Sequence, residues 1–233
     1  MADSITVATY NIHGAVGSDG RFAPERIVGV LSEIGADVVA LQEVGARHDG
    51  VDTLAWLRDA TGFHAVVGPT RWHGSAAYGN GLLSRSRIAE STQLDLTFGK
   101  RESRNALDAV IACAGGPLRV LATHLGLRPA ERREQVKALL KALEAETPHP
   151  TVLMGDLNEW FLWGRPLRWL HDHFRATPAP RSFPARAPLL ALDRIWVEPR
   201  DLLQRLWVHA SPAARAASDH LPVVAELRLP SSP

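Results

Sequence analysis

Residues 151–160 read TVLMGDLNEW, an apolar run that leads into a glycine, an aspartate and an asparagine. Thr151–Met154 is a short apolar run that follows two prolines and is closed by Gly155, which predicts a buried strand. Asp156 and Asn158 follow two positions apart, so an extended backbone would point both side chains to one side. The Asp156 carboxylate, a proton acceptor, would then lie beside the Asn158 amide, which can donate and accept hydrogen bonds. This pair suits holding and deprotonating a water molecule. The same residues also suit an ordinary tight turn after a strand.

The composition bounds the class of protein. A chain of 233 residues, 45% hydrophobic and 22% charged, is typical of an ordinary globular protein. We expect one domain over residues 1–233, with a core over about 5–229. A formal net charge of +1 gives no electrostatic argument for a general nucleic-acid binder, which is usually basic. The single cysteine, Cys113, excludes an intramolecular disulfide framework.

The sequence also bears on location. No apolar run approaches the roughly 18 residues that a membrane-spanning helix needs. The first residues lack the basic segment and long apolar stretch of a signal peptide. We therefore expect no transmembrane segment and a cytoplasmic protein, while the oligomeric state is left open.

Apolar periodicity predicts the other elements. Helical spacing indicates helices over residues 24–34, 51–61, 129–146 and about 166–171. Alternation and short apolar runs indicate strands over residues 5–10, 37–42, 63–68, 80–83, 88–98, 105–113, 118–124, 189–197, 202–208 and 221–229. Strands outnumber helices and several are joined by hairpin-like turns. This favours mixed sheets covered by helices over a regular alternation of strand and helix.

Two segments carry side chains that we expect at the surface. Residues 69–77 are predicted to form a polar and aromatic loop that exposes Trp72. In the helix over 129–146, Glu131 and Arg132 are expected on a solvated face, opposite an apolar stripe.

Polar residues recur where predicted strands begin or end. They are Asn11, Glu43, Asn80, His124, Asp156, Asn158, Asp193, Asp219 and His220. Loops at the rim of a packed sheet gather reactive groups, so we expect these side chains to meet there. Carboxylates and amides without a thiol suit a hard divalent cation such as Mg²⁺, and no CxxC or HExxH pattern indicates zinc. The histidines add phosphate contacts or acid–base capacity.

Seven short motifs then occur in order: TYNIHG, LQEV, GNGLLSR, THL, GDLN, LDRIW and SDHLPV. Together they resemble the motif series of the endonuclease/exonuclease/phosphatase superfamily. These Mg²⁺-dependent phosphoesterases include DNase I, apurinic endonucleases, inositol-phosphate phosphatases and neutral sphingomyelinases. The resemblance runs from about Ile5 to Val224. It implies an α/β four-layer sandwich, with two mixed β-sheets packed face to face, helices outside and the site at one edge.

The resemblance also implies which residues act. The implied ligands of Mg²⁺, for which Mn²⁺ is a substitute, are Glu43, Asn11 and Asp219. The implied catalytic residues are Asp156, Asn158, His124, His220 and Asp193. The candidate substrate-binding residues are Asn80, His13 and Arg104.

The implied catalytic roles are distinct. Asp156 would take the proton from the attacking water while Asn158 orients that water. His220, paired with Asp193, would contact the phosphate. His124 would face the phosphate from the other side and stabilise charge or protonate the leaving oxygen. The pairing is physically reasonable, because a neighbouring carboxylate favours the imidazolium that binds phosphate.

Three candidate residues have a second interpretation. Asn80 lies between two glycines and also suits a turn. Arg104 either reaches a phosphate or forms a surface salt bridge. His13 stands where the apurinic-endonuclease branch has an aspartate, so a carboxylate proposed for metal binding is absent. His13 either touches the substrate or is a hydrogen-bonded structural residue.

Four functions are consistent with the sequence. A phosphodiesterase or phosphatase with a phosphate-ester substrate leads. A nuclease predicts a basic groove and salt-sensitive DNA binding. A lipid or inositol-phosphate hydrolase predicts apolar loops around Trp72 and Trp160–Trp163, although such tryptophans are commonly core residues. A noncatalytic phosphate-binding module would have no need of a water-activating carboxylate.

Overall fold

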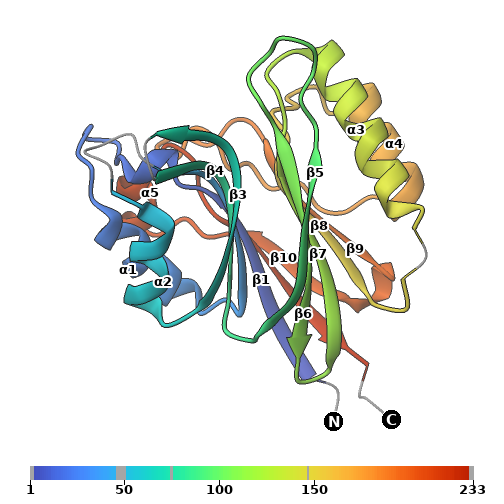
Figure 1. Ribbon diagram of the computed structural model, residues 1–233, viewed down its shortest axis with the longest axis horizontal. Coiled ribbons are helices and arrows are strands. Elements are labelled where there is room, and N and C mark those ends of the chain that lie inside the picture. Colours follow the sequence, from blue (N-terminus) through green and yellow to red (C-terminus); the bar gives the residue numbers. More distant parts are fainter. Residues whose placement is uncertain (1–2, 46–50, 74–75, 146, 231–233) are drawn as a thin grey trace.

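The computed structural model describes residues 3–45, 51–73, 76–145 and 147–230. These residues form two β-sheets that face each other, with helices on both outer faces (Figure 1). The first sheet has the spatial order β10 (Leu203–Val208), β11 (Val223–Leu229), β1 (Asp3–Asn11), β2 (Val38–Gly45), β4 (Ala76–Ser84) and β3 (His64–His73). The second has the order β5 (Ile88–Asp95), β6 (Asn105–Cys113), β7 (Gly116–His124), β8 (Thr151–Asp156) and β9 (Asp193–Glu198).

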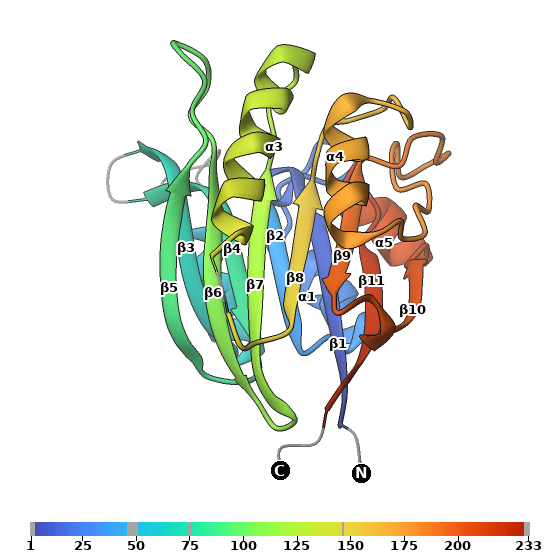
Figure 2. The same cartoon turned by 90° about the vertical axis from the view of Figure 1, so that its right-hand side faces the viewer.

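The helices form the outer layers. The first sheet is covered by α1 (Pro24–Ile34), α2 (Thr53–Thr61) and α5 (Pro212–Ala217). The second is covered by α3 (Pro129–Leu143) and α4 (Arg165–Phe174), which lie side by side (Figure 2). Two short 3₁₀ turns complete the set, η1 (His13–Ala15) and η2 (Arg200–Leu202). In the described chain no helix is both long and apolar enough to cross a membrane.

Strand alternation explains the layering. In β2, Val38 and Ala40 face the other sheet, whereas Val39 and Leu41 face the helices. Both faces are buried, so the strand is apolar throughout and not alternately polar. The result is the expected α/β four-layer sandwich, with one core between the sheets and one under each helical layer.

Two parallel strand pairs bring the site together. β1 and β2 are parallel and joined through α1, and β7 and β8 are parallel and joined through α3. Parallel strands end at the same edge of a sheet, so each pair delivers the residues at its carboxyl ends to one edge. The antiparallel strands β9 and β11 begin at this edge.

Several predicted boundaries were wrong. The loop expected over 69–77 is instead the continuation of β3, where Arg71 lies opposite Tyr78 of β4. Residues 74–75 and the side chain of Trp72 lie outside the described part. The strand expected from 189 begins at Asp193, and the strand expected to reach 98 ends at Asp95, whose carboxylate accepts from the Thr97 N–H. The short helix α5 was not predicted.

The predicted solvated face of α3 was also wrong at two positions. Glu131 and Arg132 are both buried, 4% and 0% exposed. The Arg132 guanidinium forms an ion pair with Glu159, which lies beyond β8. A buried charge needs such a partner, and this partner is 27 residues away in sequence, outside the reach of helical periodicity.

Candidate active site

Three predicted residues lie side by side where β7, β8 and β9 meet. His124 is the register partner of Asp156, and Asp156 is the register partner of Asp193. The approach of β7 to β8 is close, because a Cβ at Gly155 would overlap the carbonyl oxygen of Thr123. Glycine at this position lets the sheet bring the two carboxylates and the imidazole together.

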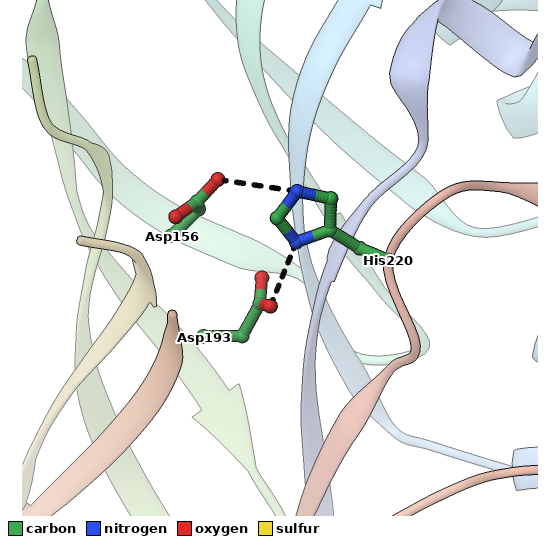
Figure 3. Close-up of side chains that lie close together, drawn as sticks. All are labelled: Asp156, Asp193 and His220. Atoms are coloured by element: carbon green, nitrogen blue, oxygen red, sulfur yellow. Dashed lines mark hydrogen bonds and ion pairs between the residues drawn. The ribbon is translucent and has the colours of Figure 1, made fainter. Parts of the chain in front are cut away.

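His220, from the segment just before β11, completes this group (Figure 3). Its Nδ1 lies 2.8 Å from Asp193 Oδ2, and its Nε2 lies 3.7 Å from Asp156 Oδ2. The same Asp193 oxygen accepts from the Ser182 hydroxyl at 2.5 Å. Burial alone would lower the pKa of His220, but the charge and hydrogen bond of Asp193, with the charge of Asp156, raise it to about 10. His220 is therefore an imidazolium at neutral pH.

Asp156 lies at the centre of the group. Its Oδ1 accepts from the backbone N–H of Asn158 at 2.9 Å. Its Oδ2 accepts from the Asn11 amide at 3.0 Å and faces His124 Nε2 at 3.5 Å. The carboxylate is 1% exposed, so its position is fixed by these partners and by His220.

The side chains of His124 and Asn158 are hydrogen-bonded to each other. The Asn158 amide nitrogen donates to the carbonyl of Leu125 at 3.0 Å and lies 3.0 Å from His124 Nε2. A carbonyl can only accept, so the amide presents its NH₂ group here and His124 Nε2 must accept. Burial also lowers the pKa of His124, to about 3. Both observations make His124 a neutral imidazole.

The first sheet contributes Asn11 and Glu43. The Asn11 amide donates to Glu43 Oε1 at 3.2 Å as well as to Asp156. Glu43 lies where the register between β2 and β4 shifts, and its φ is 54°. Asn158 and His13 also have positive φ, 50° and 49°. Left-handed backbone at non-glycine residues is uncommon and collects at functional sites.

Asp219 and His13 lie next to this group. Asp219 Oδ1 is 4.0 Å from His13 Nδ1, which also lies 3.2 Å from the carbonyl of Val16. The His13 backbone N–H donates to Asn11 Oδ1. His13 therefore supports Asn11, and the interpretation as a hydrogen-bonded residue has direct contacts behind it.

The structure separates the other two candidates. Arg104 is 7% exposed, pairs with Glu102 at 2.9 Å and lines the same hollow as Asp156. Its Nε–H is buried and has no hydrogen-bond partner among the described residues. Asn80 instead donates its amide hydrogens to the backbone carbonyl and the side-chain oxygen of Asn105. These hydrogen bonds connect β4 to β6.

A cavity of about 440 Å³ opens over these side chains. Seven of the predicted residues line it: Glu43, Arg104, His124, Asp156, Asn158, Asp219 and His220. Asn11 and Asp193 support them from beneath through the contacts given above. A hollow of about 530 Å³ lies elsewhere, around Pro148 and Pro199, so the chemistry of the lining identifies the site and not its volume.

The donor set fits a hard divalent cation. Glu43, Asp156 and Asp219 bring three carboxylates to one cavity, and one amide bridges two of them. Oxygen donors of this kind suit Mg²⁺. Ligand atoms of Asp156, Asp193 and His220 also lie within 4.8 Å of one another. In that trio Asp193 Oδ2 already accepts from Ser182 and lies against His220 Nδ1. Asp193 and His220 are therefore better described as a hydrogen-bonded pair beside the Asp156 carboxylate than as ligands of a cation.

Among the residues that sequence reasoning missed, two contact the predicted catalytic side chains directly. Ser182 fixes Asp193, and the Phe183 ring packs 4.7 Å from the His220 ring. Both lie in the proline-rich loop before β9, where no periodicity indicates which side chains turn inward. A polar residue next to an aromatic one in that loop was the only signal.

The comparisons with known proteins agree with this geometry. Residues 8–220 match the Endonuclease/Exonuclease/phosphatase family. The protein YbhP of Escherichia coli is 32% identical, over 97% of each chain. The chain therefore belongs to the Endonuclease/Exonuclease/phosphatase family.

Solved structures show the same architecture. The endonuclease/exonuclease/phosphatase of Beutenbergia cavernae superposes with a TM-score of 0.79 at 26% identity, over 97% of this chain and 72% of the other. A mannosyl-6-phosphatase of Bacteroides thetaiotaomicron superposes with a TM-score of 0.75 at 18% identity, over 96% and 99%. The fold is thus the DNase I-like α/β sandwich.

Proposed function

We propose that the protein is a Mg²⁺-dependent phosphoesterase that hydrolyses a phosphodiester or phosphomonoester by direct attack of water. One observation carries this proposal. Asp156 Oδ2, buried at the floor of an open cavity, faces two imidazole Nε2 atoms within 3.7 Å and an amide at 3.0 Å. A carboxylate so placed, with a cation beside it, suits activation of a water next to a bound phosphate.

Asp156 acts as the proton acceptor. The water oxygen forms a bond to phosphorus and its proton goes to Asp156, while the ester bond to the leaving oxygen breaks. The leaving oxygen takes up a proton from solvent. Asn158 orients the water, and its own position is fixed by Leu125 and His124. The Asn158 amide is therefore already placed before the water is deprotonated, and Asp156 becomes neutral when it accepts the proton.

His220 binds the phosphate as a cation. Asp193 accepts at Nδ1, so the Nε2–H is the group that remains for the substrate. Arg104, which pairs with Glu102, lines the same cavity and adds a second positive charge beside the anion. Two fixed cations around a phosphate stabilise the negative charge that develops on its oxygens.

His124 has an orienting role in this proposal. Its Nε2 accepts from Asn158, and its pKa is lowered to about 3 by burial. A neutral acceptor is a poor proton donor for a leaving oxygen. The geometry therefore favours positioning of Asn158 over the proton donation that the family resemblance implied.

Glu43 and Asp219, with Asn11 between Glu43 and Asp156, would hold Mg²⁺, and Mn²⁺ is a substitute. When bound, the cation neutralises charge on the phosphate and leaving oxygens. Asn11 donates to both Glu43 and Asp156 and so sets the spacing of these two carboxylates.

A substrate panel tests the proposal. It contains bis-p-nitrophenyl phosphate, p-nitrophenyl phosphate, a sugar 6-phosphate, an inositol phosphate, a phospholipid and plasmid DNA. The sugar 6-phosphate is included because a structural neighbour is a mannosyl-6-phosphatase. We expect turnover of at least one ester with Mg²⁺, loss with EDTA and recovery when Mg²⁺ is returned.

The panel also separates the alternatives. Cleavage of DNA with strong salt dependence would favour a nuclease. Binding of inorganic phosphate without hydrolysis of any ester would favour a phosphate-binding module and would reject the proposed activity. Turnover that persists in EDTA would contradict the proposed dependence of the activity on Mg²⁺.

A further inference from the structure

A group of exposed apolar side chains borders the cavity. This group, called here the apolar rim, consists of Leu127, Trp160, Phe161, Leu162 and Trp163. Its side chains are between 41% and 74% exposed, and they are five of the seven large hydrophobic side chains exposed in the described chain. The ring of Phe161 lies 6.1 Å from that of Trp160 and 6.4 Å from that of Trp163. A concentration of this kind marks an interaction surface.

The rim lies at the mouth of the site. Its residues come from the loop between β7 and α3 and the loop between β8 and α4, at the upper edge in Figure 2. Leu127 and Trp160 line the cavity that holds Asp156 and His220. Whatever covers the rim therefore also faces the catalytic groups.

The rim is held from beneath by one buried cation. Arg132 donates to the Leu127 carbonyl at 2.6 Å and to the Glu159 carboxylate at 3.1 and 3.3 Å. Its guanidinium lies 5.0 Å from the centre of the Trp160 ring. Glu159 in turn accepts from the Phe161 N–H. The apolar side chains are thus fixed outward on both loops by polar contacts, so they do not turn into the core.

The exposed charges next to the rim in sequence are mostly arginines. Arg128, Arg165 and Arg168 are exposed. Glu131 and Glu159, the acidic residues closest to the rim in sequence, are buried. Glu102, which lines the same cavity, is exposed and pairs with Arg104. A surface of tryptophan and leucine bordered by arginine complements an anionic phospholipid surface: indole rings favour the headgroup level and arginines are attracted to anionic lipid.

We propose that the apolar rim inserts into an anionic phospholipid surface and presents a headgroup phosphate ester to the cavity. This inference rests on the proposed hydrolysis and names its substrate class. The step is the same one: water oxygen bonds to phosphorus, its proton goes to Asp156, and the ester bond to the headgroup or glycerol oxygen breaks.

Vesicle flotation tests the docking. The probes are vesicles of phosphatidylcholine alone and of equimolar phosphatidylcholine and phosphatidylglycerol. We expect the protein to float with the mixed vesicles, and less as salt is raised, because screening weakens the arginine attraction. The double variant Leu162→Ala/Trp163→Ala should reduce bound protein at least about tenfold, since each large apolar side chain contributes strongly to partition.

A matched variant controls for the loss of an exposed tryptophan. Trp56 is 37% exposed on α2, in the helical layer of the other sheet. Trp56→Ala should float like the wild type. Equal flotation of the double variant and the wild type would overturn the inference, as would absence of flotation with mixed vesicles. A dimer dissociated by the double variant, without flotation, would show that a second copy covers the rim and would also overturn it.

Activity measurements keep the two proposals apart. We expect the ratio of phosphatidylglycerol hydrolysis in vesicles to bis-p-nitrophenyl phosphate hydrolysis to fall in the double variant and not in Trp56→Ala. Hydrolysis of the soluble ester without flotation or lipid turnover would reject the lipid surface and leave the phosphoesterase standing. Flotation without hydrolysis of any ester would reject the phosphoesterase and keep the docking.

Discussion

At the scale of single residues, two histidines that face the same carboxylate are in opposite protonation states. Both rings are buried, but His220 has Asp193 as a hydrogen-bonded partner, whereas His124 accepts a hydrogen bond from Asn158. Their difference follows from these contacts and not from the intrinsic imidazole, whose ordinary pKa of 6.5 is common to both. Asp156 thus has a cation on one side and a neutral ring on the other.

This difference predicts a pH dependence. The folded pKa of His220, about 10, lies above its ordinary value of 6.5, so its proton stabilises the fold fully below pH 6.5. That contribution is lost as pH rises through about 10. Side-chain ¹⁵N NMR of the metal-free protein should find His220 protonated at about pH 8 and His124 neutral.

A variant pair checks the cause. Asp193→Asn should lower the pKa of His220, because it removes the neighbouring negative charge. Asp172→Asn, at an exposed position of α4, should leave the pKa unchanged. A neutral His220 at about pH 8 in the unmodified protein would contradict the pairing.

At the scale of elements, the approach of β7 to β8 predicts a stability effect. Gly155→Ala would push a Cβ into the Thr123 carbonyl, so unfolding should become easier by roughly 1–3 kcal/mol, as for other overpacked sites. Gly29→Ala is the control, because a Cβ there meets nothing within 4 Å and alanine favours a helix. Denaturant titration measures both, and an equal effect of the two substitutions would refute the close approach.

The ion pair between α3 and the loop after β8 predicts a second effect. Arg132→Met leaves Glu159 buried without its partner, which typically costs about 3–5 kcal/mol. Lys141→Met, at an exposed position of the same helix, should change the unfolding free energy by less than about 0.5 kcal/mol. Denaturant midpoints that differ little between the two variants would mean that the pair contributes nothing.

Strand ends were predictable, whereas long-range polar partners were not. Asp156, His124 and Glu43 lie at or near the carboxyl ends of apolar strands. Parallel strands end together, so their convergence follows from the pattern. Arg132 and Glu159 carry no such signal, because each reads as a surface charge in its own segment. Ser182 lies in an irregular loop, where side-chain direction depends on the packing of the whole site.

At the scale of the whole molecule, residues of both sheets form one core. Val7 and Val38 of one sheet pack with Val120 and Val152 of the other, all fully buried. The prediction of a single domain therefore has a direct test. Far-ultraviolet circular dichroism and tryptophan fluorescence should follow the same denaturant transition, as in two-state unfolding. Two separate midpoints would mean that the sheets unfold independently.

We propose that the cavity over Asp156 hydrolyses phosphate esters. The most direct measurement is the initial rate on the best ester of the panel with Mg²⁺, for the unmodified protein, Asp156→Asn and Asp172→Asn. We expect Asp156→Asn to lower the rate by at least about 10²-fold, the usual contribution of a general base, and Asp172→Asn to leave it unchanged. Asp156→Asn protein that is folded and keeps the full rate would contradict the claim.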